Sequence, residues 1–386
     1  MPAPKADVKP LTRSQLAVLL QTPYVQMRTV FRGYPREFLN EERKRARKVL
    51  PKAQLIDLDA HRHREESEKR EREEVYRAAI RERDHLRRQL AALAGAPDVV
   101  PREVRIAQRR QSQREATAIV LASDWHCEER VTREATNGLN EFDLAIFKDR
   151  ARWFFANTAK LLHKEQRDIR IPHMILAVLG DMLSGSIHRD LAESNHLGLM
   201  DAVALAQDTI AGGIRYLLAE TDVRLTVVWK VGNHSRVTHE QRVQTEQAVS
   251  LEWLVGHSLA QFFADEPRVT FVRDRSLLTY VDVYGRAIRF THGHAFKYAG
   301  GVGGLTIPVN KKIAEWDKGR QAHLTCFGHL HTYMRGQRFV SNGSLIGYGP
   351  YSVWIGAAFE PPMQAFTLID SRFGRTVEAP VLLEQA

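Results

Sequence analysis

Aspartate, asparagine and histidine side chains gather at five places in the second part of the sequence, each directly after a predicted strand. At four of these places a glycine accompanies them. Carboxylate, carboxamide and imidazole groups suit borderline divalent cations such as Mn²⁺, Fe²⁺ or Zn²⁺, and no thiolate is among them. Five such groups in succession predict a metal centre, although any single one would predict nothing. The groups are Asp124 and His126, Asp181 after Gly180, Asn233 and His234 after Gly232, His292 and His294 around Gly293, and His329 and His331 after Gly328.

The elements that must position these groups alternate between strand and helix from residue 116 onward. Short apolar runs predict strands, and amphipathic segments between them predict helices. Helix-connected strands followed by a strand-rich part are typical of an α/β layered sandwich with helices outside. We expect strands at 116–123, 173–180, 224–232, 268–273, 277–284, 286–293, 323–328, 338–344 and 364–371, and helices at 143–165, 199–220 and 247–263.

The carboxyl ends of the strands in such a sheet share one edge, where ligands bind. Glycine at these turns lets the backbone bend sharply and lets groups approach closely. Residues i and i+2 of a strand point the same way, so Asp124 with His126, and His329 with His331, could each aim two ligands at one site. The candidate ligands exceed the usual coordination of a single ion and predict two ions bridged by a carboxylate. The alternative interpretation is a set of polar side chains that only satisfy strand ends.

The order D-x-H, G-D, G-N-H, H-G-H and G-H-x-H resembles that of the calcineurin-like metallophosphoesterases. The resemblance covers about residues 118–350, and "VSNGSL" (340–345) resembles the strand and turn that follow the last motif in that family. Within the family the arrangement resembles metallophosphoesterases of phage and prophage genomes and, more loosely, the Mre11/SbcD nucleases. The resemblance implies two mixed β-sheets flanked by helices.

The resemblance also implies a role for each residue of the centre. Asp181 would bridge the two ions, and His234 would face the substrate phosphate as electrostatic stabiliser or general acid. Many relatives carry an acidic residue where this chain has Ser235, and a second one soon after the G-D pair, so Arg236, His188 and His294 are candidates for substrate contacts. The implied ligands are Asp124, His126 and His331 for one ion, and Asn233, His292 and His329 for the other.

Two divalent ions, Mn²⁺ first and Fe²⁺, Zn²⁺ or Ni²⁺ as alternatives, would clamp the attacking and leaving oxygens of a phosphoester, and a hydroxide that bridges them would attack phosphorus. The motifs of a nucleophilic serine, a P-loop or a dinucleotide-binding fold are absent from the sequence. We therefore expect a metal-dependent phosphodiesterase, with a DNA nuclease favoured. A small-molecule phosphoesterase acting on cyclic nucleotides or phosphomonoesters is the alternative. A binding protein with a vestigial phosphoesterase domain is the second alternative.

The positive charge of the chain is concentrated at its start. Residues 1–115 contain 27 Lys and Arg against 17 Asp and Glu, whereas 116–386 contain 29 of each. A neutral body with a basic extension predicts an anionic partner, most often nucleic acid. We therefore expect a basic helical extension over 1–115, which binds DNA or serves oligomerisation, and a metallophosphoesterase domain over 116–386.

Two segments of the extension have a helical pattern. Residues 63–95 contain about two heptads of apolar residues, which leaves open a homo-oligomeric coiled coil or a solvated helix. Residues 11–33 predict two short helices around a Gln-Thr-Pro turn. A helical hairpin is favoured there over a helix-turn-helix that would present Gln26, Arg28 and Arg32.

No apolar run approaches the roughly 18 residues of a membrane span, and "MPAPKADVKP" has no apolar signal region. The two cysteines, Cys127 and Cys326, provide no disulfide framework. Both observations predict a cytoplasmic protein with reduced thiols and no membrane partner.

Overall fold

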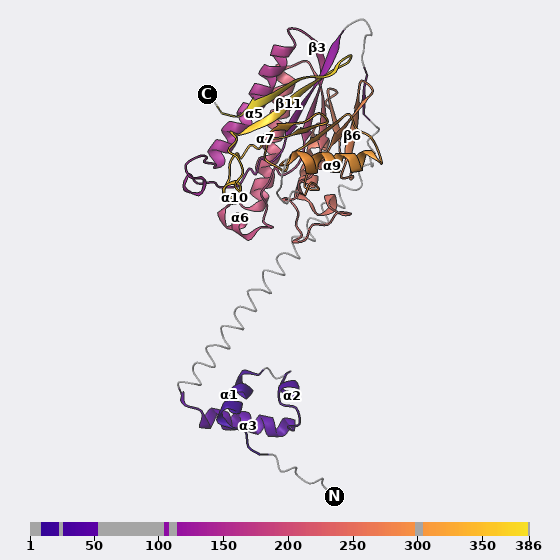
Figure 1. Cartoon of the computed structure of the whole chain (residues 1–386). Coiled ribbons are helices and arrows are strands. Elements are labelled where there is room, and N and C mark those ends of the chain that lie inside the picture. Colours follow the sequence, from indigo (N-terminus) through magenta and orange to yellow (C-terminus); the bar gives the residue numbers. More distant parts are fainter. Residues whose placement is uncertain (1–8, 23–25, 53–103, 108–113, 298–303, 385–386) are drawn as a thin grey trace. The chain divides into compact units, whose positions relative to one another are not determined.

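The computed structural model describes residues 9–22, 26–52, 104–107, 114–297 and 304–384 (Figure 1). The chain divides into two compact units, Met1–Val99 and Val100–Ala386. The helix predicted over 63–95 lies outside the described residues. The composition changes near residue 115, but Arg105–Ile106 already pairs with a strand of the second unit.

The first unit contains three described helices around a small apolar core. Thr12 begins α1 with a capping box, in which its side chain accepts from the backbone of Gln15 and the Gln15 side chain accepts from the Thr12 backbone. The second helix predicted here is a single turn, so the expectation that Gln26 and Arg32 lie on it was wrong. The helices are α1 (Arg13–Gln21), α2 (Met27–Val30) and α3 (Arg36–Val49), and the buried side chains include Leu16, Leu19, Met27, Leu39 and Ala46.

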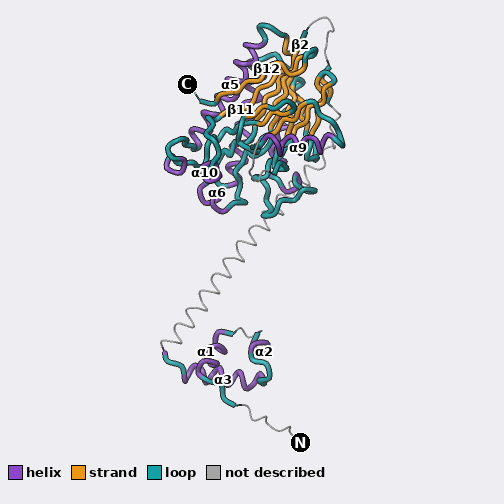
Figure 2. Tube along the Cα trace, in the orientation of Figure 1, coloured by secondary structure: helices purple, strands orange, loops and turns teal. Residues whose placement is uncertain are grey.

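The second unit is built on two mixed six-stranded sheets. Figure 2 shows the strands gathered in the body of this unit, with helices outside them. In one sheet the order is β1-β6-β7-β8-β10-β9, and in the other it is β12-β11-β2-β3-β4-β5. Strands β2 to β5 are parallel, whereas β11 is antiparallel to both of its neighbours. The bounds are β1 (Arg105–Ile106), β2 (Glu115–Ala122), β3 (Arg170–Val178), β4 (Arg224–Trp229), β5 (Val269–Val272), β6 (Thr279–Val283), β7 (Arg286–Phe290), β8 (Leu324–Phe327), β9 (Met334–Arg335), β10 (Phe339–Ser341), β11 (Met363–Asp370) and β12 (Gly374–Leu382).

The alternation of side chains along β2 shows how the layers are held together. Ile119 and Leu121 point into the core between the two sheets, where they meet Val281 and Phe290 of the other sheet. Val120, on the opposite face, packs with the core under the helices. Because both faces of β2 are buried, the strand is apolar from Ala118 to Ala122.

Helices cover the outer faces of both sheets. Side chains of α5, α7 and α8 pack on the sheet that contains β2, and side chains of α9 pack against Phe327 and Phe339 of the other sheet. The expected α/β layered sandwich of two mixed sheets flanked by helices is therefore confirmed. The helices are α5 (Leu144–Glu165), α6 (Arg189–Ser194), α7 (Leu199–Glu220), α8 (Leu251–Phe262), α9 (Thr306–Asp317) and α10 (Pro350–Ile355), with 3-10 helices η1 (Glu134–Thr136) and η2 (Gln247–Val249).

Both cysteines are buried and free. Among the described residues no helix is both long and apolar enough to cross a membrane.

Candidate metal centre

The predicted ligands lie just beyond the ends of their strands, in an unusual backbone conformation. Strand β2 ends at Ala122 and β8 at Phe327, so the residues after them are in turns. A positive φ in a residue other than glycine is uncommon and costs about 1–3 kcal/mol, and such strain concentrates at functional sites. Five of the seven described non-glycine residues with positive φ are predicted ligands, namely Asp124 (57°), His126 (47°), Asp181 (51°), His329 (69°) and His331 (50°).

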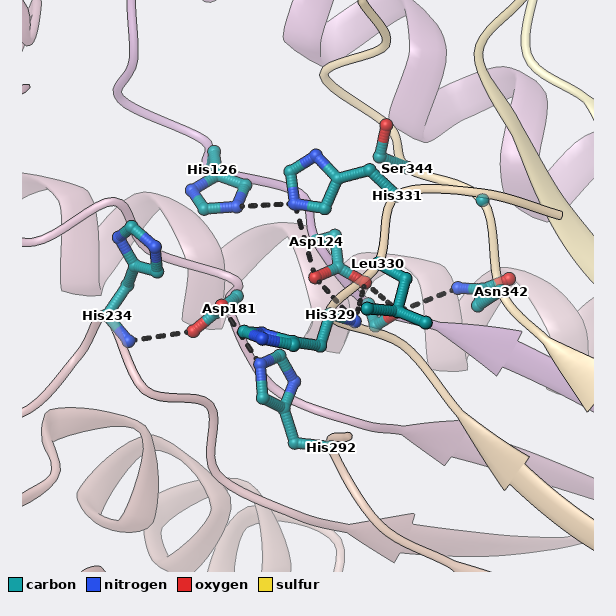
Figure 3. Close-up of polar contacts among 12 residues, drawn as sticks. Asp124, His126, Asp181, His234, His292, His329, Leu330, His331, Asn342 and Ser344 are labelled. Atoms are coloured by element: carbon teal, nitrogen blue, oxygen red, sulfur yellow. Dashed lines mark hydrogen bonds and ion pairs between the residues drawn. The ribbon is translucent and has the colours of Figure 1, made fainter. Parts of the chain in front are cut away.

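Asp124, His126 and His331 form a first triad whose ligand atoms all lie within 4.8 Å of one another. The Nε2 atoms of His126 and His331 are 3.3 Å apart, and His331 Nε2 lies 3.4 Å from Asp124 Oδ1 (Figure 3). Asp124 and His126 are buried, whereas the His331 side chain keeps 31% of its surface exposed. The triad is therefore open on the His331 side.

Asp181, His292 and His329 form a second triad that meets the same 4.8 Å limit. His292 Nε2 lies 3.0 Å from Asp181 Oδ2 and 3.0 Å from Asn233 Oδ1. The predicted Asn233 is thus in place beside this triad. His329 and His331 turn through positive φ instead of continuing the β8 strand, and they join different triads, which is the division between two ions that the resemblance implied.

Glycines allow the turns to lie against one another. A Cβ on Gly232 would overlap the backbone nitrogen and the carboxylate of Asp181, and a Cβ on Gly328 would overlap the Asp124 carboxylate. The turns that carry the two triads are therefore packed more closely than any side-chain-bearing residue would permit.

Hydrogen bonds fix which ring nitrogen faces each triad. His292 Nδ1 is 2.7 Å from the Leu179 carbonyl oxygen, so it carries the proton and donates, with Nε2 directed at Asp181. His126 Nδ1 is 3.0 Å from Ser184 Oγ, and Ser184 in turn donates to Glu129 Oε2 at 2.7 Å. Outer partners of this kind orient imidazole ligands in metal sites. Glu129 belongs to none of the predicted motifs, so the sequence analysis missed it.

Charge is balanced within each triad. Burial would raise the pKa of Asp124, but the hydrogen bond and charge of His331 outweigh burial and lower it. The pKa of Asp181 is lowered in the same way, because His292 and His234 hold it well below the ordinary value despite burial. Burial lowers the pKa of His292, yet the Asp181 carboxylate dominates and raises it to about 10. In the second triad an ionised carboxylate thus faces an imidazole that holds a proton, which a cation would displace.

The other two imidazoles are held neutral. Burial, followed by the charge of His292, lowers the pKa of His329 to about 3. Burial and the charge of His234 likewise lower the pKa of His126 well below its ordinary value. Neutral imidazole is the form that binds a metal ion. The donor set, the ring orientation and the charge balance all fit a divalent cation in each triad. Burial raises the pKa of the Cys127 and Cys326 thiols, which is consistent with their lying outside the centre.

His234 lies at the rim of the centre. Its backbone N–H donates to Asp181 Oδ1 at 2.9 Å, and its ring lies 4.9 Å from that of His126 between centroids. His234 Nδ1 is 3.1 Å from the Ser184 carbonyl oxygen, so Nδ1 donates and Nε2 is left for another partner. The exposed His188 ring is 5.3 Å from the His234 ring.

The remaining two predicted substrate contacts have partners within the protein. Arg236 donates to the carbonyl oxygens of Asn233, Thr238 and His239, and it thereby holds the turn after Asn233. His294 Nε2 lies 2.9 Å from Glu246 Oε1, while His294 Nδ1 is buried and has no hydrogen-bond partner. Contact of either residue with a substrate stays a prediction.

Glu252 is a residue of the site that the sequence analysis missed. It lies in the first turn of α8 and is fully buried. Its Oε1 accepts from the Met182 backbone at 2.7 Å, and its Oε2 accepts from the Gly232 backbone at 2.7 Å. Burial, reinforced by the Asp181 charge, raises the pKa of Glu252 to about 7. One carboxylate therefore fixes the turns that carry Asp181 and Asn233. No motif surrounds it, since it lies in an ordinary amphipathic helix.

The segment "VSNGSL" supports the first triad. The Asn342 side chain donates to Ser123 Oγ at 2.8 Å, and the Leu345 backbone donates to the Asp124 carbonyl oxygen at 3.1 Å. Ser123 Oγ in turn donates to the Asp124 carboxylate. This segment therefore holds the backbone and the side chain of Asp124.

Comparisons with known proteins give fold relatives alone. No family model matches the chain, and no curated protein matches its sequence. One similar solved structure is an uncharacterized protein of Streptococcus pneumoniae described as a predicted phosphoesterase (12% identity, TM-score 0.26, 66% of this chain and 83% of that chain). Another is Vps29 of Entamoeba histolytica with Zn²⁺ (12%, 0.27, 68% and 99%). A third is the Thermus thermophilus sulfate thiohydrolase SoxB (9%, 0.30, 69% and 57%).

The resemblance to the calcineurin-like metallophosphoesterases is thus matched by the two-sheet fold and by the grouping of the motif residues. The structure thus combines an α/β fold of two mixed sheets with two candidate sites for divalent metals.

Proposed function

We propose that the protein is a two-metal phosphodiesterase that cleaves DNA. The observation that carries the proposal is the pair of adjacent triads, Asp124–His126–His331 and Asp181–His292–His329. Divalent ions held there would neutralise charge on the phosphoryl oxygens and supply an ionised water at neutral pH. Mn²⁺ suits this donor set, and by the resemblance the Asp181 carboxylate would be shared by the two ions.

The chain's own residues would divide the remaining work. The Asp181 carboxylate holds the backbone of His234 and so sets the position of that ring. With its Nδ1 donating to Ser184, a protonated His234 still has an Nε2–H to donate to a phosphoryl or leaving oxygen. The neighbouring His188 lies where a second contact to the phosphate could form. His331, partly exposed, marks the side from which substrate enters.

DNA is favoured as the substrate because the excess of Lys and Arg is confined to residues 1–115. Basic side chains supply most of the sequence-independent affinity for a phosphodiester backbone. The second unit contains both triads and its own cores, so the first unit would serve to bind substrate.

The test is cleavage of a single-stranded and a duplex oligonucleotide with Mn²⁺ and then with EDTA, using the full chain. We expect Mn²⁺-dependent cleavage that Asp124→Ala or His234→Ala abolishes. The fragment 100–386 should lose activity on DNA but keep its rate on bis-p-nitrophenyl phosphate.

Three outcomes would contradict parts of the proposal. Hydrolysis of bis-p-nitrophenyl phosphate with intact DNA would favour a small-molecule phosphoesterase. Equal activity of the full chain and the fragment on DNA would remove the role of the basic extension. A purified protein that takes up no Mn²⁺ would indicate a binding protein with a vestigial centre.

A further inference from the structure

Two aromatic side chains on α10 are almost fully exposed. Tyr351 is 70% exposed and Trp354 81%, which makes Trp354 the most exposed large hydrophobic side chain in the described part of the chain. Their ring centroids lie 6.0 Å apart with 31° between the ring planes. No residue of α10 is buried, so its aromatic side chains contribute no core packing. An aromatic pair on the surface costs solubility and so calls for a function.

The backbone that carries the pair is held on both sides. Helix α10 begins with Pro350 and ends at Gly356, which has the left-handed conformation of a helix terminus. Before the helix, Tyr348 packs edge-on against Phe359, and its hydroxyl donates to the Ala357 carbonyl oxygen at 3.1 Å. The exposed rings therefore project from a braced turn rather than from a loose loop.

The same segment runs directly from the metal centre. The Leu345 backbone bonds to Asp124, and the Asn140 side chain donates to the carbonyl oxygens of Ile346 and Tyr348 at 2.9 and 2.8 Å. The six steps from Leu345 to Tyr351 span at most about 22 Å even when extended. The backbone of Tyr351 thus lies within about that distance of Leu345, which bonds to Asp124, and this is the reach of a few nucleotides.

We propose that Tyr351 and Trp354 form a stacking platform for bases of single-stranded DNA whose phosphodiester lies at the two triads. The inference rests on the proposed function and names the form of its substrate. Aromatic faces stack with every base, so binding does not depend on the DNA sequence, as a nuclease of this kind requires. Duplex DNA keeps its bases stacked on each other, so the platform favours single strands or frayed ends.

Other occupants fit the surface less well. A membrane-binding helix needs a long apolar face with cationic residues opposite, whereas α10 has six residues. Helix α10 packs against η1, and Arg133, just before η1, pairs with Glu141 at 3.4 Å between Nε and Oε2. Both side chains are exposed, so a phosphate could replace the carboxylate as the partner of Arg133. The continuity with the metal centre and this nearby cation therefore favour nucleic acid.

The experiment compares two single-stranded oligonucleotides of equal length with the full-length protein and Mn²⁺. One is oligo(dT), and the other has abasic tetrahydrofuran units next to the cleaved bond, so that backbone charge is the same. We expect wild type to cleave oligo(dT) with kcat/KM about 10-fold higher, as loss of a stacked base predicts. Y351A/W354A should bring this ratio close to one with the abasic rate unchanged, and Trp354→Phe should restore most of it.

A matched control is Phe373→Ala, which removes another aromatic side chain that is 61% exposed and lies in the turn between β11 and β12. It should leave the ratio at the wild-type value. The platform would be overturned if the double variant kept the wild-type preference for oligo(dT), or if it also cleaved the abasic oligonucleotide more slowly. In either case, cleavage of DNA by wild type would still support the proposed function. If wild type cleaved neither oligonucleotide yet hydrolysed bis-p-nitrophenyl phosphate, the proposed function would fail, and the platform with it.

Discussion

At the carboxyl ends of the strands, His292 contacts Asp181, whereas toward the amino end of β3, His173 contacts Thr226 at 2.7 Å and lies near Arg224. The carboxylate raises the pKa of His292 to about 10 against the effect of burial. At the other end, burial and the Arg224 charge lower the pKa of His173 to about 4. Burial is common to both residues, so the difference teaches that the partner decides which form of a buried imidazole is present.

The two ends also differ in shape and in what they can bind. A cavity of about 920 Å³ lies at the amino end, where Asp222, His173 and Arg224 are among its lining residues. Among the described residues, however, the groups that could hold a metal ion are the two triads at the carboxyl end. The open volume and the chemistry are therefore at opposite ends of the sheets.

Asp181→Asn should have the largest effect, because it removes charge from the second triad and the predicted bridge between the ions. The loss of phosphodiesterase rate should exceed the about 10- to 100-fold that outer partners of metal ligands contribute. Asp222→Asn, at the amino-end cavity, should leave the rate unchanged. Rates on bis-p-nitrophenyl phosphate and bound Mn²⁺ per chain would measure both variants. Equal losses would remove the distinction between the two ends.

Gly232→Ala should lose nearly as much phosphodiesterase rate as Asp181→Asn, because the added methyl group would displace the Asp181 carboxylate. Gly212→Ala is the matched control, since a Cβ there meets nothing within 4 Å and α7 favours alanine. Thermal unfolding with and without Mn²⁺ would separate the two. The stabilisation by Mn²⁺ should disappear in Gly232→Ala and remain in Gly212→Ala.

Glu252→Gln should lower Mn²⁺ affinity by about 10- to 100-fold, the range for residues that orient metal ligands. The new amide would turn an N–H toward the backbone donor of Gly232 or Met182 and push the two turns apart. Titration calorimetry measures the affinity, with the exposed Glu220→Gln as control. An unchanged affinity together with a lower melting temperature would assign Glu252 to folding alone.

His173→Gln should have the smallest effect, confined to stability in acid. The folded pKa of about 4 lies below the unfolded value of 6.5, so the unfolded chain binds a proton first as pH falls. The stability that neutral His173 provides is complete above pH 6.5 and is lost toward pH 4, by at most about 3 kcal/mol. Glutamine should flatten this slope in urea unfolding, whereas exposed His163→Gln should not. If the dependence of stability on pH persisted in His173→Gln, it would have to come from other groups.

The sequence could single out the candidate ligands because each belongs to a short motif that follows an apolar strand. The expectation that all the ligands share the edge of one sheet was wrong, because Asp181 follows β3 and His292 follows β7 of the other sheet, so only the resemblance placed the two in one centre. The strands ended earlier than the apolar pattern suggested. The runs 173–180 and 286–293 continue through Gly180 and Gly293, whose positive φ bends the chain away from the ladder.

Other features left no pattern to find. Glu129 and Glu252 act through backbone and hydroxyl groups that only the folded chain brings near. Helix α8 begins at Leu251 rather than at 247, because the extended backbone of Ser250 separates it from η2. Helix α10 is too short to show helical periodicity, so its exposed aromatic pair was not foreseen.

The left-handed backbone of five ligands has a consequence for laboratory evolution. Asparagine or glycine would relax each of these positions, at a gain of about 1 kcal/mol or more. A screen that rewards heat resistance alone, with no demand for turnover, should therefore erase Asp124, Asp181 and His329 before it alters the apolar layers. Variants selected in this way would keep the fold and lose the metal-dependent activity.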